Sequence, residues 1–192
     1  MRLASYEWGV RRRQRLFVRL TRALGAELDD VGKASLRRPE LFGRPFLRFA
    51  HVLLRGPSAW SVGERELFAA AVSRANSCAF CIGTHGEIAA QELGPDVIGD
   101  GRLGPRAAAT AAFLEALTRD PESISAVDTE RARRAGVDDD ALAEAIYIAF
   151  LFNTMNRVAD ALAFEHRSDR DRRRGAAMLR RRGYRVPEQL LR

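Results

Sequence analysis

Apolar residues recur along most of the chain at the three- and four-residue spacing that marks one face of an α-helix. Strand-like alternation is missing, and no Asn-Gly or Asp-Gly pair joins two strand-like runs. Breaks in the helical pattern fall at Gly56-Pro57, Gly94-Pro95 and Asp120-Pro121. We therefore predict an all-α fold, a single-domain helical bundle whose amphipathic helices share one core.

The first amphipathic stretch runs from Tyr6 to Leu24, and arginines occupy much of its polar surface. Its apolar stripe consists of Val10, Leu16, Phe17, Leu20, Ala23 and Leu24. This stripe predicts a helix that packs on the body of the protein or on another subunit. A helix lying on a membrane surface is the alternative interpretation.

A second helical stretch begins at Arg38-Pro39 and ends at Gly56-Pro57, and Pro45 predicts a kink within it. Its apolar positions are Leu41, Phe42, Phe46, Phe49, Val52 and Leu53. His51 lies among these apolar residues. We interpret it as a hydrogen-bonded core histidine rather than a ligand.

The central stretch, from Glu66 to Gln91, begins inside a helix that a capping box at Ser61-Val-Gly-Glu64 opens. That helix is expected to reach Ala75, with small residues sharing the face of Glu66 so that another helix can approach the carboxylate. Asn76-Ser77 is expected to break the helix and to cap a new one. The new helix would carry Cys78 in its first turn.

Further helices are predicted beyond the Gly99–Pro105 loop, at 106–117 and 123–134. The most apolar helix follows, opened by Asp138, Asp139 and Asp140, whose charges suit the positive end of its dipole. We expect three parts: a basic amphipathic helical segment (residues 1–37), a helical core (38–166) and an arginine-rich tail (167–192) that forms a peripheral helix or is partly disordered.

Length and composition agree with one soluble domain: the 192 residues are 46% hydrophobic, with no apolar run long enough to span a bilayer. No secretory signal is visible. The net charge of +7 comes almost entirely from arginine, since Lys33 is the single lysine. These arginines are spread over the chain without a recognisable nucleic-acid-binding motif, which argues against DNA or RNA as a partner.

The two cysteines form one Cys78-Ala-Phe-Cys81 motif, with His85 four residues beyond the second thiol. Such a pair without other cysteines excludes a disulfide framework and favours a reducing, cytoplasmic setting with a redox or metal role. A helix N-terminus lowers a thiol pKa, and His85, one turn from Cys81, can act as its base. Glu66 can orient the imidazole. We expect Cys81 to attack a peroxide and Cys78 to resolve the sulfenic acid.

Three alternatives remain open. The cysteines can be core residues, or Cys78, Cys81, His85 and Glu66 can bind zinc. The motif can also be a redox sensor that changes oligomeric state without turnover.

At these residues the chain resembles the alkyl hydroperoxidase D-like proteins of the carboxymuconolactone decarboxylase superfamily, in particular an uncharacterised peroxidase-related branch. The resemblance lies in Glu66, Cys78-Ala-Phe-Cys81 and His85. It continues in Arg134-Ala-Gly-Val-Asp-Asp and in the helix from Phe152 to Leu162. The pattern departs from the hydroperoxidase at Phe80, where that enzyme has a histidine.

This resemblance implies a helical fold of that family's type and peroxide reduction by thiols, without haem, flavin or metal. It implies a hydroperoxide substrate, an external thiol or disulfide reductant, and a homo-oligomer that is a trimer, or a hexamer built from dimers or trimers. By motif, Glu66, Cys78, Cys81 and His85 carry over as relay and redox pair. No membrane partner is implied.

The last apolar helix also carries a polar trio, Asn156, Arg157 and Asp160. We interpret the trio as a buried ion-pair network that holds helices or subunits together rather than as catalytic residues. His166, just beyond this helix, is expected at the surface.

Overall fold

The computed structural model of the chain describes residues 2–6, 11–23, 28–95 and 103–185, and these contain helices and turns but no strand. The all-α prediction is therefore confirmed. The longer helices are α1 (Arg12–Ala23), α2 (Asp30–Arg37), α3 (Leu47–Arg55), α4 (Val62–Ala75), α5 (Ala79–Leu93), α7 (Pro105–Arg119), α8 (Ala126–Arg134), α9 (Asp139–Leu162) and α10 (Asp169–Arg182). A π-helical segment, η2 (Pro39–Phe46), precedes α3, and η1 (Ala4–Tyr6) and η3 (Pro121–Ser123) are single 3₁₀ turns.

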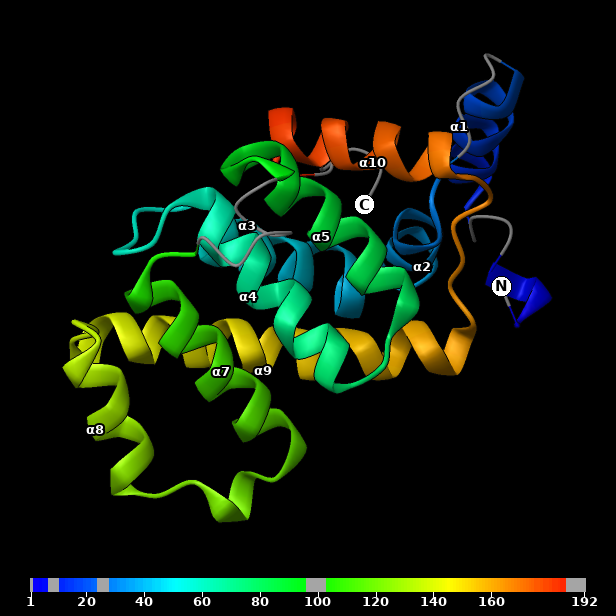
Figure 1. Cartoon of the computed structure of the whole chain (residues 1–192). Coiled ribbons are helices and arrows are strands. Elements are labelled where there is room, and N and C mark those ends of the chain that lie inside the picture. The colour runs from blue at the N-terminus through cyan, green and yellow to red at the C-terminus, as the bar shows by residue number, and fades with distance from the viewer. Residues whose placement is uncertain (1, 7–10, 24–27, 96–102, 186–192) are drawn as a thin grey trace.

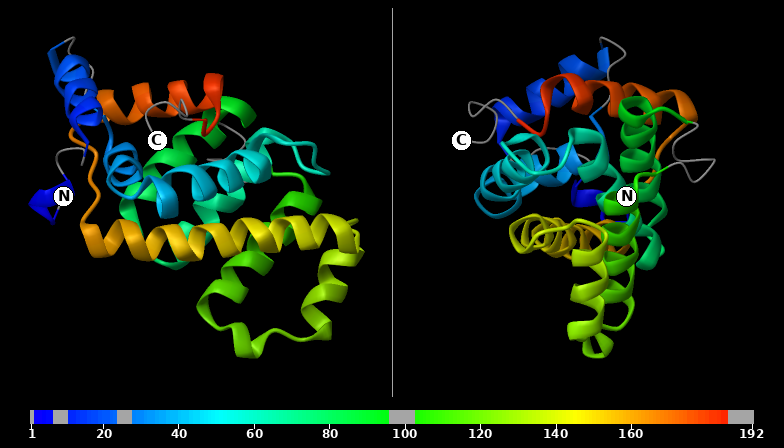
Figure 2. Two further views of the ribbon diagram at one scale, coloured as in Figure 1. Left: turned by 180° about the vertical axis from the view of Figure 1, so that it is seen from behind. Right: turned by 60° about the vertical axis from the view of Figure 1, so that its left-hand side comes forward.

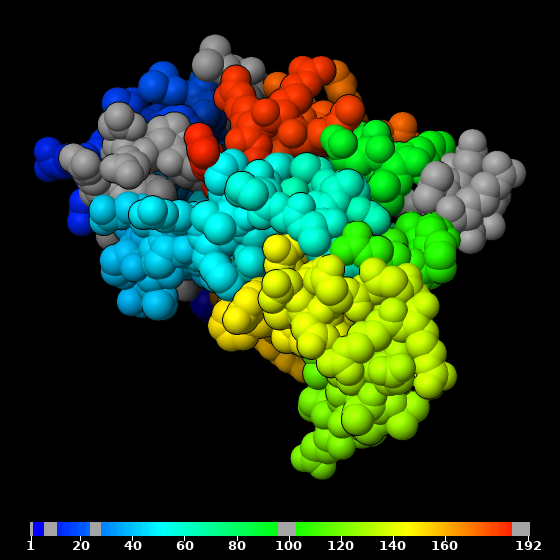
Figure 3. Space-filling model, turned by 90° about the vertical axis from the view of Figure 1, so that its left-hand side faces the viewer, coloured from blue at the N-terminus to red at the C-terminus, as the bar shows by residue number. Residues whose placement is uncertain are grey.

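The antiparallel pair α4–α5 occupies the centre of the molecule, with α9 running along one side and α10 crossing α5 on the other (Figure 1). The same order of layers is visible from behind and from the side (Figure 2). Helices α7 and α8 project beyond α9 as a separate lobe of the surface (Figure 3). The CxxC motif therefore lies in the middle layer, between α9 and the helices that cover it.

The main core is organised around Trp60, which is almost fully buried just before α4. Its indole nitrogen donates to the carbonyl of Ala141 at 2.8 Å, and its ring packs edge-on against Phe68 with the centroids 4.9 Å apart. The guanidinium of Arg106 lies 4.2 Å above the same ring. One side chain thereby joins α4, α7 and the start of α9.

Several helix boundaries are where the sequence predicts them. The Ser61–Glu64 capping box opens α4, Gly56 ends α3, and Asp138 caps α9 by accepting from the amide of Ala141. Gly94, with φ of 92°, ends α5 in a conformation that favours glycine. The predicted kink at Pro45 lies near the junction between η2 and α3.

The N-terminal region differs from the prediction. Helix α1 starts at Arg12, and Val10, Leu24 and most of the expected Gly99–Pro105 loop lie outside the described residues. Leu16 and Leu20 are 58% and 54% exposed, so they do not pack on the body of this chain, and their packing on another subunit stays a prediction. The helix packs instead through Val18 and the half-buried Phe17, which contact Leu36 of α2.

One further expectation needs correction. The residue that caps α5 is Cys78 rather than Ser77, because Ser77 adopts φ of 58° and completes the turn out of α4. The tail contains the expected peripheral helix, α10, in which Ala176 alone is buried, and Tyr184 just beyond it is buried as well. Within the described parts of the chain, no helix has the length and apolar character needed to cross a bilayer.

We predict that Trp60→Ala lowers the free energy of unfolding by about 3–5 kcal/mol, because it empties a large buried volume. Trp60→Phe keeps most of the ring packing and loses the bond to Ala141, so its cost should be nearer ~1 kcal/mol. Urea unfolding of both variants gives the comparison. Equal losses would show that the indole hydrogen bond, rather than the packing, carries the effect.

Candidate functional site

The turn between α4 and α5 places the two cysteines next to each other. The amide of Cys78 donates to the carbonyl of Ser73 at 3.0 Å, so the chain reverses immediately after α4. Cys78 then caps α5, and Cys81 lies in the first turn of that helix. Of the amides in this first turn, that of Cys81 interacts with the thiol of Cys78.

Both thiols are buried, with 0% of Cys78 and 1% of Cys81 exposed. They belong to an apolar cluster with residues from α2, α5, α9 and the segment after α9. The buried members besides the cysteines are Ala34, Phe80, Met155, Ala159 and Phe164, and Phe42 and Phe46 of η2 pack against them. We call this group the thiol cluster. Helix α2 and η2 thus cover one side of the cysteine pair, and residues of α5, α9 and the segment after α9 pack around the rest of it.

The two thiols have opposite electrostatic environments. Hydrogen bonding from the Cys81 thiol lowers the pKa of Cys78, helped by the Cys81 amide, although burial and the carboxylate of Asp160 oppose the shift. The same contact with Cys78, together with burial, raises the pKa of Cys81 well above its ordinary value.

Beside the thiols, the carboxylate of Glu66 is fully buried and makes three contacts with charged or polar side chains. One oxygen lies 2.6 Å from Nδ1 of His85. The other accepts from Arg55 at 2.6 Å and from the hydroxyl of Tyr184 at 2.8 Å. We call these four residues the Glu66 network.

This network keeps Glu66 ionised. Burial alone would raise the pKa of Glu66, but the charge and hydrogen bond of His85 and the charge of Arg55 hold it below its usual value. Burial, followed by the charge of Glu66, raises the pKa of Tyr184 far above that of free tyrosine, so its hydroxyl remains a donor. The His85 ring also packs edge-on against Phe152, with the centroids 4.5 Å apart.

The predicted residues therefore form two neighbouring groups on α4 and α5. Glu66 and His85 are in contact as expected, and the two cysteines are adjacent. Among the described residues, however, no hydrogen bond joins His85 to either thiol. In the same part of the chain, no group of three or more histidine, cysteine or acidic side chains is arranged to hold a metal ion.

Arg55 and Tyr184 are members of the network that sequence reasoning missed. Tyr184 reaches the site because α10 packs on α5, where Arg172 pairs with Glu87 at 2.6 Å and Arg180 pairs with Glu92. Gly183 then turns with φ of 64°, so close to the His51 ring that a β-carbon would not fit. A glycine followed by an isolated aromatic residue was the only local signal.

The polar trio on α9 does not form a buried ion-pair network between the helices of this chain. Asn156 alone is buried, and its amide nitrogen donates to Ser73 at 3.1 Å while its oxygen accepts from Asn76 at 3.0 Å. Arg157 and Asp160 are exposed because their positions on α9 lie outside its packed face. Asp160 nevertheless influences Cys78 through its charge, and the Asn156 amide lies near Cys81.

The other two histidines also occupy positions that sequence reasoning did not foresee. His166 is half-buried rather than at the surface, stacked on Phe80 at a centroid distance of 4.4 Å, with Nε2 2.9 Å from the Phe80 carbonyl. An imidazole therefore lies against the ring of the residue that departs from the family pattern. His51 is half-buried and hydrogen-bonded, as expected, but it lines a groove instead of the core.

We predict that Tyr184→Phe moves acid unfolding to higher pH. A lowered Glu66 pKa stabilises the fold above the unfolded value near 4.5, and this stability is lost as pH falls through the lower folded pKa. Without the hydroxyl, the folded pKa should rise toward the ordinary value, at a cost of about 1 kcal/mol at neutral pH. Tyr147→Phe, on the exposed face of α9, is the matched control. Identical acid transitions for both variants would exclude a role for this hydrogen bond.

Residues 40–95 match the carboxymuconolactone decarboxylase family. An uncharacterised peroxidase-related protein from Silicibacter sp. TM1040 is similar in structure, with 26% identity and a TM-score of 0.65 over 81% of this chain and 85% of that one. A second similar structure, described as an alkylhydroperoxidase AhpD core and an uncharacterised peroxidase-related protein, comes from Ralstonia eutropha JMP134. It shares 24% identity and a TM-score of 0.69 over 84% of this chain and 88% of that one. No protein of curated function matches the sequence.

The family match includes Glu66, both cysteines and His85, and the structural likeness covers 81% of the chain. These matches support the resemblance of the chain to the alkylhydroperoxidase D-like proteins of the carboxymuconolactone decarboxylase superfamily.

Proposed function

We propose that the protein is a cysteine-based peroxidase that reduces organic hydroperoxides through Cys78 and Cys81 and serves an antioxidant role. The observation that carries the proposal is the geometry of the thiol pair, in which Cys78 caps α5, Cys81 follows in the first turn, and a hydrogen bond from Cys81 lowers the pKa of Cys78. A thiolate at a helix N-terminus with a second thiol one turn away is the arrangement that dithiol redox chemistry needs.

In the proposed reaction the Cys78 thiolate attacks the distal oxygen of the hydroperoxide, and the O–O bond breaks. The alkoxide leaves as an alcohol after taking up a proton, and Cys78 becomes a sulfenic acid. Cys81 then attacks that sulfur, releasing water and forming the Cys78–Cys81 disulfide. An external thiol or dithiol of the cell restores both thiols, so the net reaction consumes two reducing equivalents.

This assignment reverses the roles that helical spacing suggested. His85 is one turn from Cys81, but its Nδ1 is engaged by Glu66 at 2.6 Å. We propose that the Glu66–His85 pair supplies and accepts protons during resolution, when the buried Cys81 must lose its proton. Arg55 and Tyr184 act as positioning residues for Glu66.

The proposal includes a homo-oligomer, a trimer or a hexamer, in a cytoplasmic, reducing setting. Support comes from the exposed apolar side chains of α9, where Tyr147 and Phe150 are 57% and 62% exposed. The proposal includes no bound cofactor, and neither nucleic acid nor a membrane as partner.

A second candidate is a redox sensor that forms the disulfide without turnover. The specific observation that favours it is the burial of both thiols, since at most 1% of either is exposed. Slow oxidation with a change in oligomer size would be its signature.

Stopped-flow oxidation with cumene hydroperoxide should consume two thiols per wild-type chain much faster than free cysteine reacts. Cys81→Ser should react as fast and stop at a sulfenic acid, which dimedone captures, whereas Cys78→Ser should lose most of its reactivity. If the wild-type protein is oxidised no faster than free cysteine, the peroxidase proposal is wrong and the redox-sensor candidate is favoured.

The thiolate titration of Cys78 should depend on the donor at position 81. Cys81→Ser retains a hydroxyl that can donate to the Cys78 sulfur, whereas Cys81→Ala has none. Because this hydrogen bond is the largest cause of the lowered pKa, Cys78 should titrate at higher pH in the alanine variant than in the serine variant. Thiolate absorbance at 240 nm against pH measures both. Equal titrations in the two variants would assign the shift to the helix terminus alone.

A further inference from the structure

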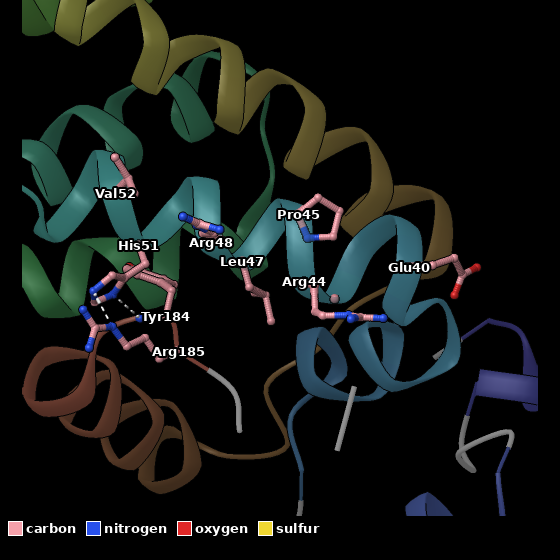
Figure 4. Close-up of a pocket in the computed structure, with 10 residues that line it drawn as sticks. Glu40, Arg44, Pro45, Leu47, Arg48, His51, Val52, Tyr184 and Arg185 are labelled. Carbon is pink, nitrogen blue, oxygen red and sulfur yellow. Dashed lines mark hydrogen bonds between the residues drawn. The ribbon is translucent and has the colours of Figure 1, made fainter. Parts of the chain in front are cut away.

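An open groove of about 1010 Å³ lies beside η2 and α3, and the chain that follows α10 forms one of its walls (Figure 4). The residues that line it are Glu40, Gly43, Arg44, Pro45, Leu47, Arg48, His51, Val52, Tyr184 and Arg185. None of these belongs to the CxxC motif. The groove is therefore separate from the thiol cluster.

The groove carries positive charge that its own residues do not balance. Arg44 and Arg48 are exposed, one turn apart, and make no hydrogen bond or ion pair with any described residue. Arg185 donates through Nε to Nε2 of His51 at 2.9 Å, an acceptor without negative charge. The single acidic residue of the lining, Glu40, is already paired with Arg38 at 2.6 Å.

The remaining wall is apolar. Pro45 and Val52 are exposed, and Leu47 forms a buried part of the lining between the two free arginines. Guanidinium groups beside a hydrocarbon surface fit a ligand that carries an anionic head group on an apolar chain. Arginine is abundant in this protein, so arginines alone do not identify a binding site. The groove differs because its arginines lie beside a concave apolar wall, whereas the arginines of α1 lie on the exposed surface of a helix.

Two contacts join the groove to the redox centre. Phe42 and Phe46 stack at a centroid distance of 4.7 Å and pack against the thiol cluster, while Gly43 and Arg44 of the same segment line the groove. Segment η2 therefore separates the groove from the buried thiols. Tyr184 lines the groove and donates to Glu66 at 2.8 Å.

We propose that this groove binds the carboxylate end of a long-chain organic hydroperoxide, with Arg44 and Arg48 holding the carboxylate. The proposal rests on the peroxidase function proposed above and names its substrate class. The hydrocarbon chain lies over Pro45 and Leu47, against the segment that covers Cys78 and Cys81. The bound substrate would therefore contact η2, the segment that must move before a hydroperoxide can reach Cys78 and Cys81.

Direct binding tests the groove without any turnover. Isothermal titration calorimetry of the reduced full-length chain should show decanoate binding about tenfold more tightly than decanol, which has the same chain and no charge. Arg44→Gln/Arg48→Gln should weaken decanoate binding by about tenfold or more. Arg12→Gln/Arg19→Gln, which removes two exposed arginines of α1, should leave it unchanged. Equal affinity for decanoate and decanol, or equal losses in both double variants, would overturn the proposal.

Competition with inorganic phosphate distinguishes a carboxylate-binding site from a phosphate-binding site. Decanoate binding that persists in excess phosphate supports a carboxylate site. Displacement by phosphate at similar affinity would show a phosphate site and overturn the substrate class proposed here.

Kinetics then connect the groove to the reaction. The KM for linoleic acid hydroperoxide should be about tenfold lower than the KM for its methyl ester, and Arg44→Gln/Arg48→Gln should abolish that ratio. If the wild-type protein turns over both substrates with equal KM, the proposed role of the groove is wrong and the peroxidase proposal is retained. Decanoate binding without turnover of any hydroperoxide would instead overturn the peroxidase.

Discussion

The structure depends on one buried negative charge, the carboxylate of Glu66. A charge in this position is costly unless it is paired and hydrogen-bonded, so the fold must bring partners to it. His85 arrives from α5, Arg55 from the end of α3, and Tyr184 from the chain beyond α10. Three consecutive helices and a segment 118 residues further along the chain therefore meet at a single side chain. The same requirement explains why α10 is tied to α5 by ion pairs, since displacing α10 would remove Tyr184 from the carboxylate.

The elements that could be predicted from sequence are those with local causes. The capping box at Ser61–Glu64, the stops at Gly56 and Gly94, and the charged start of α9 depend on side chains within a few residues of the boundary. Glu66 and His85 also belong to adjacent helices, which makes their contact foreseeable. Arg55 and Tyr184 had no such signal, because each becomes a partner of Glu66 only through the packing of α3 and α10. The exposed Leu16 and Leu20 show the converse, since periodicity identifies an apolar stripe but not what covers it.

The roles of the two thiols illustrate how a shift of one residue changes an interpretation. Spacing places His85 one turn from Cys81 and suggests Cys81 as the nucleophile. In the structure the left-handed Ser77 makes Cys78 the cap of α5, and the Cys78 thiol accepts from the Cys81 thiol and amide. The imidazole is committed to Glu66. A hydrogen bond between the thiols lowers the pKa of its acceptor, Cys78, and raises that of its donor, Cys81. This contact affects the difference between the two thiol pKa values more directly than His85 does.

The burial of both cysteines gives a physical reason for the unusual segment that covers them. A redox pair in an apolar cluster is protected from indiscriminate oxidation, but a substrate needs a way in. The cover consists of α2 and of η2, a π-helical segment that contains Pro45, a residue without an amide hydrogen to donate. Because η2 also contributes to the arginine-lined groove, the substrate recognition that we propose and access to the thiols would involve the same segment.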